Sequence, residues 1–425
     1  MKIVIVGAGV AGLVCGRTLQ RAGHEVIILE ASDAVGGRVR SDNVEGFTLE
    51  RGFQVLFTAY PAAQRQLEYS RLALRAFQPG AIISKDGKRY VLSDPVRDPS
   101  ALVSSALAPV VHLTDKVRTG TLAFSLIRKS IHEIITGPDE TTEEFLRRSH
   151  FSSDYINNFI RPFFGGVYLD NSMNTSAKCF KFDFKMLSQG QTVIPAGGMG
   201  KISEQLAEGQ NIRFFARVAA LLKDNSGRYY GARLEDGEEI TGDAVVVSTP
   251  APEAARLTGK AMPEKPTSTI NLYYSGSARL YEGKKLVLNA NSDPFINNCV
   301  LVSNISPEHA PEGQHLLSAT ILGVPDATDD ELYQRGMVDL RRIFQGDSHP
   351  EVALSSYRPL AIYRIPFGQF AQPPGIHPTL PDNDSGEPGL YFAAEFTEAS
   401  SLNAAMVSGE KAAALIQQRL PALAR

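Results

Sequence analysis

The first residues with recognisable chemistry are Gly7, Gly9 and Gly12, which directly follow the apolar run Lys2–Val6. This spacing predicts a buried strand, a tight turn and a helix that begins at Val10. In such a unit Gly7 permits the turn, Gly9 lets a diphosphate approach the backbone, and Gly12 lets the helix pack closely on the strand. The N–H groups and the positive dipole end of the helix then face the phosphates. These residues therefore predict a dinucleotide site.

Further polar residues follow at the spacing that such a site requires. A second strand is predicted to end at Glu30, where an acid hydrogen-bonds the ribose hydroxyls of a dinucleotide. A glycine pair, Gly36 and Gly37, then precedes Arg38 and Arg40. A guanidinium group at this place is able to bind a diphosphate through two parallel hydrogen bonds.

With Gly-Gly-Arg after its second strand, the chain resembles the superfamily of flavin amine oxidases, phytoene desaturases and protoporphyrinogen oxidases. The resemblance implies FAD rather than a nicotinamide nucleotide. It places Arg38 at the diphosphate, Gly52 beside the isoalloxazine ring and the backbone of Val218 at the adenine. The cofactor-binding residues that it implies are Gly7, Gly9, Val10, Ala11, Gly12, Glu30, Ala31, Gly36, Gly37, Arg38, Gly52, Phe53, Gln54, Val218, Glu395, Leu402, Asn403 and Ala404.

The C-terminal block carries the other half of the resemblance. A turn over Glu395–Ser401, with two serines as possible caps, precedes a helix that is predicted to run to Arg419. The N-terminus of such a helix stabilises negative charge on a reduced flavin. Ala394 and Ala404 stand where the family usually has glycine. The block contains no cysteine, so the covalent flavin link of monoamine oxidases is excluded and the FAD is expected to be non-covalent.

The pattern as a whole predicts an α/β fold: a Rossmann-like FAD-binding domain, discontinuous in sequence, plus a mixed helical and β-sheet substrate domain. An α/β pattern that resumes after a helical insertion is the reason for the discontinuity. The predicted FAD-binding domain comprises residues 1–58, 192–266 and 384–425, and the predicted substrate domain comprises residues 59–191 and 267–383.

Within the substrate domain, helices are predicted to dominate up to about residue 188, with Thr141 or Thr142 as the cap of one of them. By its residues alone, Arg161–Asp170 is interpreted as an aromatic-rich turn. Arg358–Pro366 is interpreted as a proline-broken segment that is able to approach a ligand. A set of apolar residues at helical spacing is interpreted as core, with a lipophilic substrate tunnel as the alternative: Leu122, Phe124, Leu126, Ile127, Ile131 and Ile134.

Composition excludes several other classes of function. The formal net charge of -3 and the absence of a basic stripe argue against nucleic-acid binding. Three widely spaced cysteines form neither a disulfide framework nor a metal cluster, and the histidines are scattered, so no metal site is predicted. A reducing, cytoplasmic location fits these cysteines. No segment is predicted to cross a membrane, and peripheral membrane contact stays compatible with the sequence.

The resemblance implies an FAD-dependent oxidoreductase in which a small, lipophilic organic substrate delivers a hydride to flavin N5. The aromatic segment 161–170 and the absent covalent cysteine favour desaturation or oxidation of a carotenoid-like or porphyrinogen-like molecule. Oxidation of an amine at its CH–NH bond, with oxygen as the acceptor, is the alternative. A non-enzymatic lipid- or prenyl-binding module of the same fold need not keep the glycine and acidic residues of the cofactor site. This chain has them, so such a module is disfavoured. A flavin-bound carrier or isomerase without net redox turnover stays open. The sequence identifies no catalytic acid or base, no electron acceptor and no oligomeric state.

Overall fold

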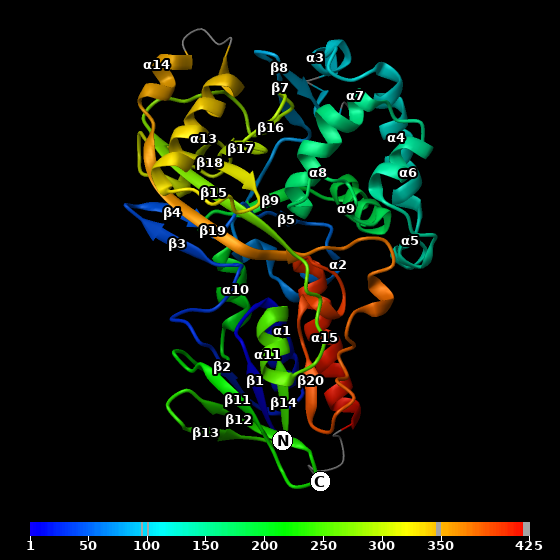
Figure 1. The fold of residues 1–425 in the computed structure, drawn as a ribbon, viewed down its shortest axis with the longest axis vertical. Helices are drawn as coiled ribbons and strands as arrows, with labels where there is room; N and C mark the ends of the chain where they lie inside the picture. The colour runs from blue at the N-terminus through cyan, green and yellow to red at the C-terminus, as the bar shows by residue number, and fades with distance from the viewer. Residues whose placement is uncertain (95–96, 100–101, 346–349, 420–425) are drawn as a thin grey trace.

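The computed structural model describes residues 1–94, 97–99, 102–345 and 350–419. Figure 1 shows three regions: a lower region that contains the N-terminus, an upper sheet region with α13, and an upper helical region that runs from α3 to α9. Short segments join the three regions in the middle of the molecule.

The lower region is built on a five-stranded parallel sheet with the order β10-β2-β1-β14-β20. Its central strands are apolar on both faces, as expected for strands that helices cover on both sides. All five strands come from the three segments predicted to form the FAD-binding domain. They are β1 (Lys2–Val6), β2 (Glu25–Leu29), β10 (Ile212–Arg213), β14 (Ala244–Val247) and β20 (Leu390–Phe392).

Helices pack against this sheet, and a small antiparallel sheet extends it. The contact between the first and last helices is close: a Cβ atom at Gly409 would lie 2.5 Å from the carbonyl oxygen of Ala11. The helices are α1 (Val10–Arg21), α10 (Gly200–Ala207), α11 (Ala251–Thr258) and α15 (Leu402–Arg419). The small sheet contains β11 (Val218–Lys223), β12 (Tyr229–Leu234) and β13 (Glu239–Thr241). The predicted α/β class with a Rossmann-like parallel sheet is confirmed.

The upper sheet has seven strands in the order β19-β15-β18-β17-β16-β7-β8, and α13 (Asp329–Phe344) and α14 (Pro350–Ser355) belong to the same region. The strands are β7 (Ala81–Lys85), β8 (Lys88–Leu92), β15 (Pro266–Gly276), β16 (Leu286–Asn289), β17 (Asn298–Leu301), β18 (His315–Leu322) and β19 (Arg358–Phe370). The interpretation of 358–366 as a broken segment is wrong, because β19 is continuous. It lies at the edge of the sheet, where a proline does not interrupt the pairing on the outer side.

The helical region contains α3 (Leu102–Leu107), α4 (Leu113–Arg128), α5 (Ile131–Thr136), α6 (Thr142–Arg148), α7 (Ser153–Tyr155), a π-helical turn (Ile156–Ile160), α8 (Arg161–Tyr168) and α9 (Ala177–Gln189). Thr141 caps α6 through a capping box with Glu144, as predicted. The interpretation of 161–170 as a turn is wrong. Pro162 lies just after the π-helical turn 156–160, and the helix continues until Leu169 adopts a φ of 55°.

The predicted core assignment of the residues around α4 is correct only in part. Leu126 and Ile134 are buried, but Phe124 is 61% exposed and Ile127 is 41% exposed. The assignment of these two side chains to the core is therefore wrong. The spacing alone did not reveal which face of α4 turns inward.

The connecting segments carry the remaining described elements. They include the hairpin β3 (Ser41–Val44) and β4 (Phe47–Glu50), the small sheet β5 (Leu56–Phe57), β9 (Thr192–Pro195) and β6 (Leu74–Ala76), the helices α2 (Pro61–Gln66) and α12 (Val302–Ile305), and short 3-10 turns at Tyr69–Arg71, Pro307–His309, His377–Thr379 and Glu395–Thr397. Helix α2 ends at Gln66, because Leu67 is extended.

Candidate active site

Two glycines of the first turn are required for packing. Gly7 has a φ of +106°, and a Cβ atom there would lie 2.5 Å from the carbonyl oxygen of Ser248. A Cβ atom at Gly12 would lie 2.3 Å from the carbonyl oxygen of Gly7. A side chain at Gly7 would therefore force Ser248, directly after β14, away from the turn, and one at Gly12 would distort the turn itself.

Two other glycines face open space instead. A Cβ atom at Gly9 would lie 4.0 Å from its nearest heavy atom, and one at Gly37 would lie 3.9 Å from the Cα atom of Gly9. The two turns are joined by a hydrogen bond of 2.9 Å from the N–H of Gly36 to the carbonyl oxygen of Ala8. The first residues of α1, Val10 and Ala11, carry no side-chain cap on their N-terminal N–H groups. This open backbone surface fits a diphosphate.

Glu30 lies at the carboxyl end of β2, where its side chain is held by the same turn. One carboxylate oxygen accepts a hydrogen bond of 2.9 Å from the N–H of Ala8. The other accepts from the N–H and the hydroxyl of Ser32 at 2.9 and 2.7 Å. Ala31 lies in the chain between Glu30 and Ser32. The carboxylate is thus oriented beside the phosphate turn, at the place where a ribose would follow the diphosphate.

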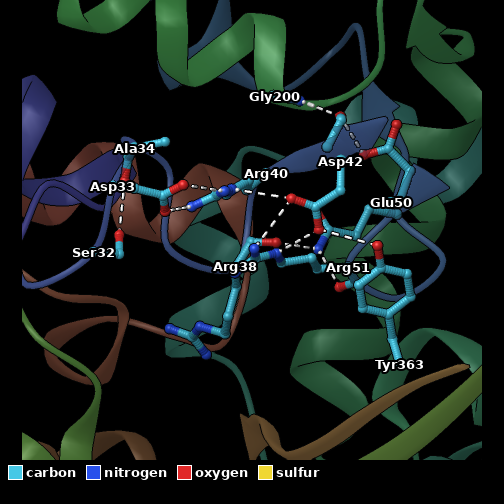
Figure 2. Close-up of polar contacts among 12 residues, drawn as sticks. Ser32, Asp33, Ala34, Arg38, Arg40, Asp42, Glu50, Arg51, Gly200 and Tyr363 are labelled. Atoms are coloured by element: carbon cyan, nitrogen blue, oxygen red, sulfur yellow. Dashed lines mark hydrogen bonds and ion pairs between the residues drawn. The ribbon is translucent and has the colours of Figure 1, made fainter. Parts of the chain in front are cut away.

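Of the two arginines in the predicted diphosphate region, only Arg38 faces the C-terminal block. Figure 2 shows Arg40 bound to Asp33 and Asp42, while the guanidinium group of Arg38 points away from that network. Arg38 forms an ion pair with Glu395 and donates a hydrogen bond of 2.9 Å to the carbonyl oxygen of Gly368. It therefore links the second glycine turn to β19 and to the residues before α15.

The predicted flavin-ring segment lies against the upper sheet. Gly52 has a φ of +93°, and a Cβ atom there would lie 2.7 Å from the terminal carbon of Ile365 on β19. Gln54 donates hydrogen bonds to the carbonyl oxygens of Arg38 and Arg51 at 2.6 and 3.1 Å. Phe53 is half-buried and contacts the ring of Phe77, with centroids 6.3 Å apart. Contacts with β19 and with the backbone of Arg38 and Arg51 thus hold residues 52–54 in place.

The start of α15 lies beside the start of α2. Ser401 caps α15 by accepting a hydrogen bond of 3.1 Å from the N–H of Ala404, while Leu402 begins the helix. The side-chain oxygen of Asn403 accepts from the N–H of Ala62 at 3.0 Å. Both Ala394 and Ala404 are buried, so their methyl groups fill space that a glycine would leave open.

Val218 lies near the opposite end of the predicted site. The N–H of Ala216 donates a hydrogen bond of 2.8 Å to the carbonyl oxygen of Glu30, which brings the start of β11 next to β2. The carbonyl oxygen of Val218 accepts from Arg256 at 2.8 Å. The sequence did not predict this contact between Arg256 and the backbone of Val218.

The contacts above join neighbouring parts of the predicted site, and the chemistry of these residues fits FAD. Glu30 would bind a ribose, and the open glycine surface together with Arg38 would bind the diphosphate. The cofactor supplies the redox chemistry of the site, and the protein supplies binding, orientation and electrostatics.

Sequence reasoning missed a buried polar cluster formed by Tyr60, Tyr168 and Asp183. Tyr168 at the end of α8 donates a hydrogen bond of 2.9 Å to the carboxyl group of Asp183 on α9. The phenol group of Tyr60, which precedes α2, lies close enough to the same carboxyl group to favour its charged form. All three residues are less than 10% exposed. No local pattern signals the cluster, because its members are contributed by three separate elements.

Burial changes the acidity of this cluster. It raises the pKa of Asp183 to about 7, although the two nearby phenol groups favour the charged form. Burial and the nearby carboxyl group raise the pKa of Tyr60 and of Tyr168 well above the ordinary range. At neutral pH Asp183 is therefore able to accept or release a proton, while both phenols stay protonated.

The cluster lies where the lower and helical regions meet. The ring of Phe182, next to Asp183 in the chain, stacks on Tyr60 with centroids 6.1 Å apart and packs against the cores of both regions. One α-helical turn earlier, Cys179 contacts Gln372, and Gln372 accepts a hydrogen bond of 2.9 Å from the N–H of Ser400, just before α15. The inward side of α9 thus faces the segments predicted to hold the flavin.

Comparison with known proteins identifies the family. The sequence model for flavin-containing amine oxidoreductases matches residues 10–417. Coproporphyrinogen III oxidase of Bacillus subtilis is 22% identical over 82% of this chain and 84% of its own length. The 15-cis-phytoene desaturase of Solanum lycopersicum is 23% identical over 98% of this chain and 78% of its own length.

Solved structures share the fold. A putative protoporphyrinogen oxidase from Exiguobacterium superposes with a TM-score of 0.73 at 20% identity, covering 98% of this chain and 99% of that one. Putrescine oxidase bound to putrescine superposes with a TM-score of 0.70 at 19% identity, covering 99% of this chain and all of that one.

The match across nearly the whole chain shows that this protein belongs to the flavin-containing amine oxidoreductase family. It is an FAD-dependent oxidoreductase, and the predictions of the family, of enzymatic activity and of non-covalent FAD are confirmed. Its relatives include porphyrinogen oxidases, desaturases and polyamine oxidases, so the family by itself does not fix the substrate.

Proposed function

We propose that this enzyme oxidises a C–H bond of a lipophilic, porphyrinogen-like substrate, with FAD accepting the hydride at N5. The observation that carries the proposal is the buried cluster of Asp183, Tyr60 and Tyr168, which aromatic rings adjoin. A mainly apolar site with one buried polar group suits a large apolar molecule that must be oriented by a few hydrogen bonds.

The chemistry of the carboxyl group favours a substrate with N–H groups. When a methylene C–H next to a pyrrole leaves as a hydride, the substrate carbon and nitrogen take up positive charge, and the N–H proton must then depart. Asp183, with its pKa near neutrality, is suited to accept an N–H hydrogen bond and then that proton. Tyr60 and Tyr168 hold the carboxyl group in place. The residues at the flavin and diphosphate are the ones that the resemblance implies.

A carotenoid-like hydrocarbon, the other lipophilic candidate, offers no N–H group to Asp183 and is therefore ranked lower. Oxidation of an amine is the second candidate function. The same carboxyl group favours it, because a carboxylate pairs with an ammonium group as well as with a pyrrole N–H. Similarity to polyamine oxidase 2 of Arabidopsis thaliana, 25% identical over 59% of this chain, gives independent support to this alternative.

Anaerobic reduction of the bound flavin distinguishes these substrates. The purified holoenzyme is mixed with a porphyrinogen, a carotenoid precursor in detergent or a polyamine, and the flavin absorption is followed. Bleaching by the porphyrinogen, with appearance of porphyrin absorption, is the expected result. Bleaching by the polyamine alone would establish the amine oxidase, and bleaching by the carotenoid precursor alone would contradict the role given to Asp183.

A variant tests the role of the carboxyl group separately. Asp183→Asn is expected to lower the rate of flavin reduction about 100-fold, the usual contribution of a positioned acid or base, without changing the FAD content. Asp170→Asn, at a partly exposed acid just beyond α8, is the matched control. Loss of FAD from both variants, or equal rates in both, would refute the assignment.

A further inference from the structure

Large apolar side chains are exposed mainly in one part of this molecule. Of the twelve large hydrophobic residues that the described structure leaves exposed, seven lie on or beside α3, α4 and α5. We call these seven the α4 surface: Val103, Leu107, Leu113, Val117, Phe124, Ile127 and Ile135. Figure 1 shows α4 on the outer side of the helical region, away from both sheets. Clustered exposed apolar residues mark an interaction site more often than isolated ones do.

Helix α4 has apolar residues on two sides: Leu122 and Leu126 pack on the core of the helical region, and a second apolar side faces solvent. Leu113, Val117 and Phe124 follow one another at helical spacing and are 66, 65 and 61% exposed. The inward side also carries a polar residue, Asp115, which is fully buried. Asp115 accepts hydrogen bonds from the N–H and hydroxyl of Ser152 at 3.0 and 2.5 Å.

Specific contacts fix this orientation. Lys185 on α9 donates hydrogen bonds to the carbonyl oxygens of Leu126 and Ile127 at 3.0 and 2.8 Å. Thr119 is hydrogen-bonded to the hydroxyl of the buried Tyr155 at 2.8 Å. These contacts on the inward side of α4 hold its other side, with Leu113, Val117 and Phe124, toward solvent. The exposure of these side chains is therefore not caused by loose packing of the helix.

Positive charge accompanies the apolar side chains. The guanidinium carbon of Arg128 lies 5.3 Å from the ring centroid of Phe124, and Lys129 follows directly. Between residues 102 and 136 there are four basic and two acidic residues, and one of the acids is the buried Asp115, whereas the whole chain has a net charge of -3. The local charge therefore has the opposite sign to that of the protein.

We propose that the α4 surface docks the protein on an anionic phospholipid bilayer. A helix with large apolar side chains on its outer side and cations at its end is suited to lie in the headgroup region of a bilayer. The described residues contain no helix that is long and apolar enough to cross a membrane, so the contact is peripheral. A second copy of this chain is a poorer partner, because like charges at Arg128 and Lys129 would meet. This proposal does not depend on which substrate is oxidised.

Vesicle flotation tests the proposal with the full-length holoenzyme. Vesicles of phosphatidylcholine alone are compared with vesicles that also contain phosphatidylglycerol. Binding to the anionic vesicles, weakened by salt, is expected. The double variant Val117→Ser/Phe124→Ser should lower the partition coefficient at least about 100-fold, because each large apolar side chain withdrawn from lipid costs about a factor of 10 or more. Arg128→Gln/Lys129→Gln should remove the preference for anionic vesicles.

The control is Val338→Ser, which changes a 64% exposed residue on α13, outside the α4 surface. Flavin absorption shows that each variant is folded. Absence of binding by the unchanged protein, or binding that the double variant leaves intact, would overturn the proposal. A concentration-dependent dimer that Val117→Ser/Phe124→Ser abolishes, without vesicle binding, would show that the surface joins two copies instead.

Discussion

Substitution of Gly9 or Gly12 by alanine should separate cofactor binding from folding, although both glycines belong to one turn. Gly9 has φ and ψ of -71° and 171°, a conformation open to any residue. A Cβ atom there has no neighbour closer than 4.0 Å. Gly9→Ala should therefore change the free energy of unfolding of the apoprotein by less than about 1 kcal/mol.

The affinity for FAD should respond in the opposite way. The methyl group of Gly9→Ala would lie 4.0 Å from the carbonyl oxygen of Ser248 and would occupy space at the turn where a diphosphate is expected to approach the backbone. We expect the Kd for FAD to rise at least about 100-fold, which corresponds to about 2.7 kcal/mol. In Gly12→Ala the Cβ atom would lie 2.3 Å from the carbonyl oxygen of Gly7, so the apoprotein itself should lose about 3 kcal/mol or fail to fold.

Two measurements on the apoprotein check this pair: the free energy of unfolding in denaturant and the quenching of FAD fluorescence on titration. Gly120→Ala is the control, because Gly120 lies on the exposed side of α4 with no heavy atom within 4 Å of a Cβ. Normal FAD affinity in Gly9→Ala would refute the placement of the diphosphate at this turn. A destabilised Gly9→Ala apoprotein would refute the claim that the space is open.

Three further outcomes follow from the structure. The raised pKa of Asp183 means that the folded state holds this proton up to about pH 7, whereas the unfolded state releases it near 3.8. The free energy of unfolding of the apoprotein should therefore fall as pH rises between these values, by about 4 kcal/mol at most. Denaturation curves at several pH values should show this fall in the unchanged protein and not in Asp183→Asn. Lys285→Met removes the cation 2.8 Å from the buried Asp98 and should cost about 3 kcal/mol, whereas Lys411→Met, in a largely exposed pair, should cost less than about 1 kcal/mol in the same assay. Ser401→Ala removes the cap of α15 and should lower the melting temperature, at a cost of about 1 kcal/mol; an unchanged melting temperature would show that the cap does not contribute.

Predictions from the sequence succeeded where the determining contacts are local. The strand, turn and helix around Gly7 and Gly12 need only neighbouring residues and one pairing strand, so their spacing was sufficient. The predicted cap at Thr141 was likewise set by nearby residues. The interpretation of 161–170 as an aromatic-rich turn was wrong, because residues 161–168 form a helix whose aromatic side chains pack in the core.

The sequence by itself thus determined the α/β class, the phosphate turn and the family, since these depend on backbone conformation and on spacing within short segments. Only the tertiary structure brought Tyr60, Tyr168 and Asp183 together, because burial and the hydrogen bonds among them require three separate elements to meet. Only the tertiary structure also showed that Phe124 faces solvent. Helical spacing defines an apolar side, but the packing of α4 on α9 decides which way that side turns.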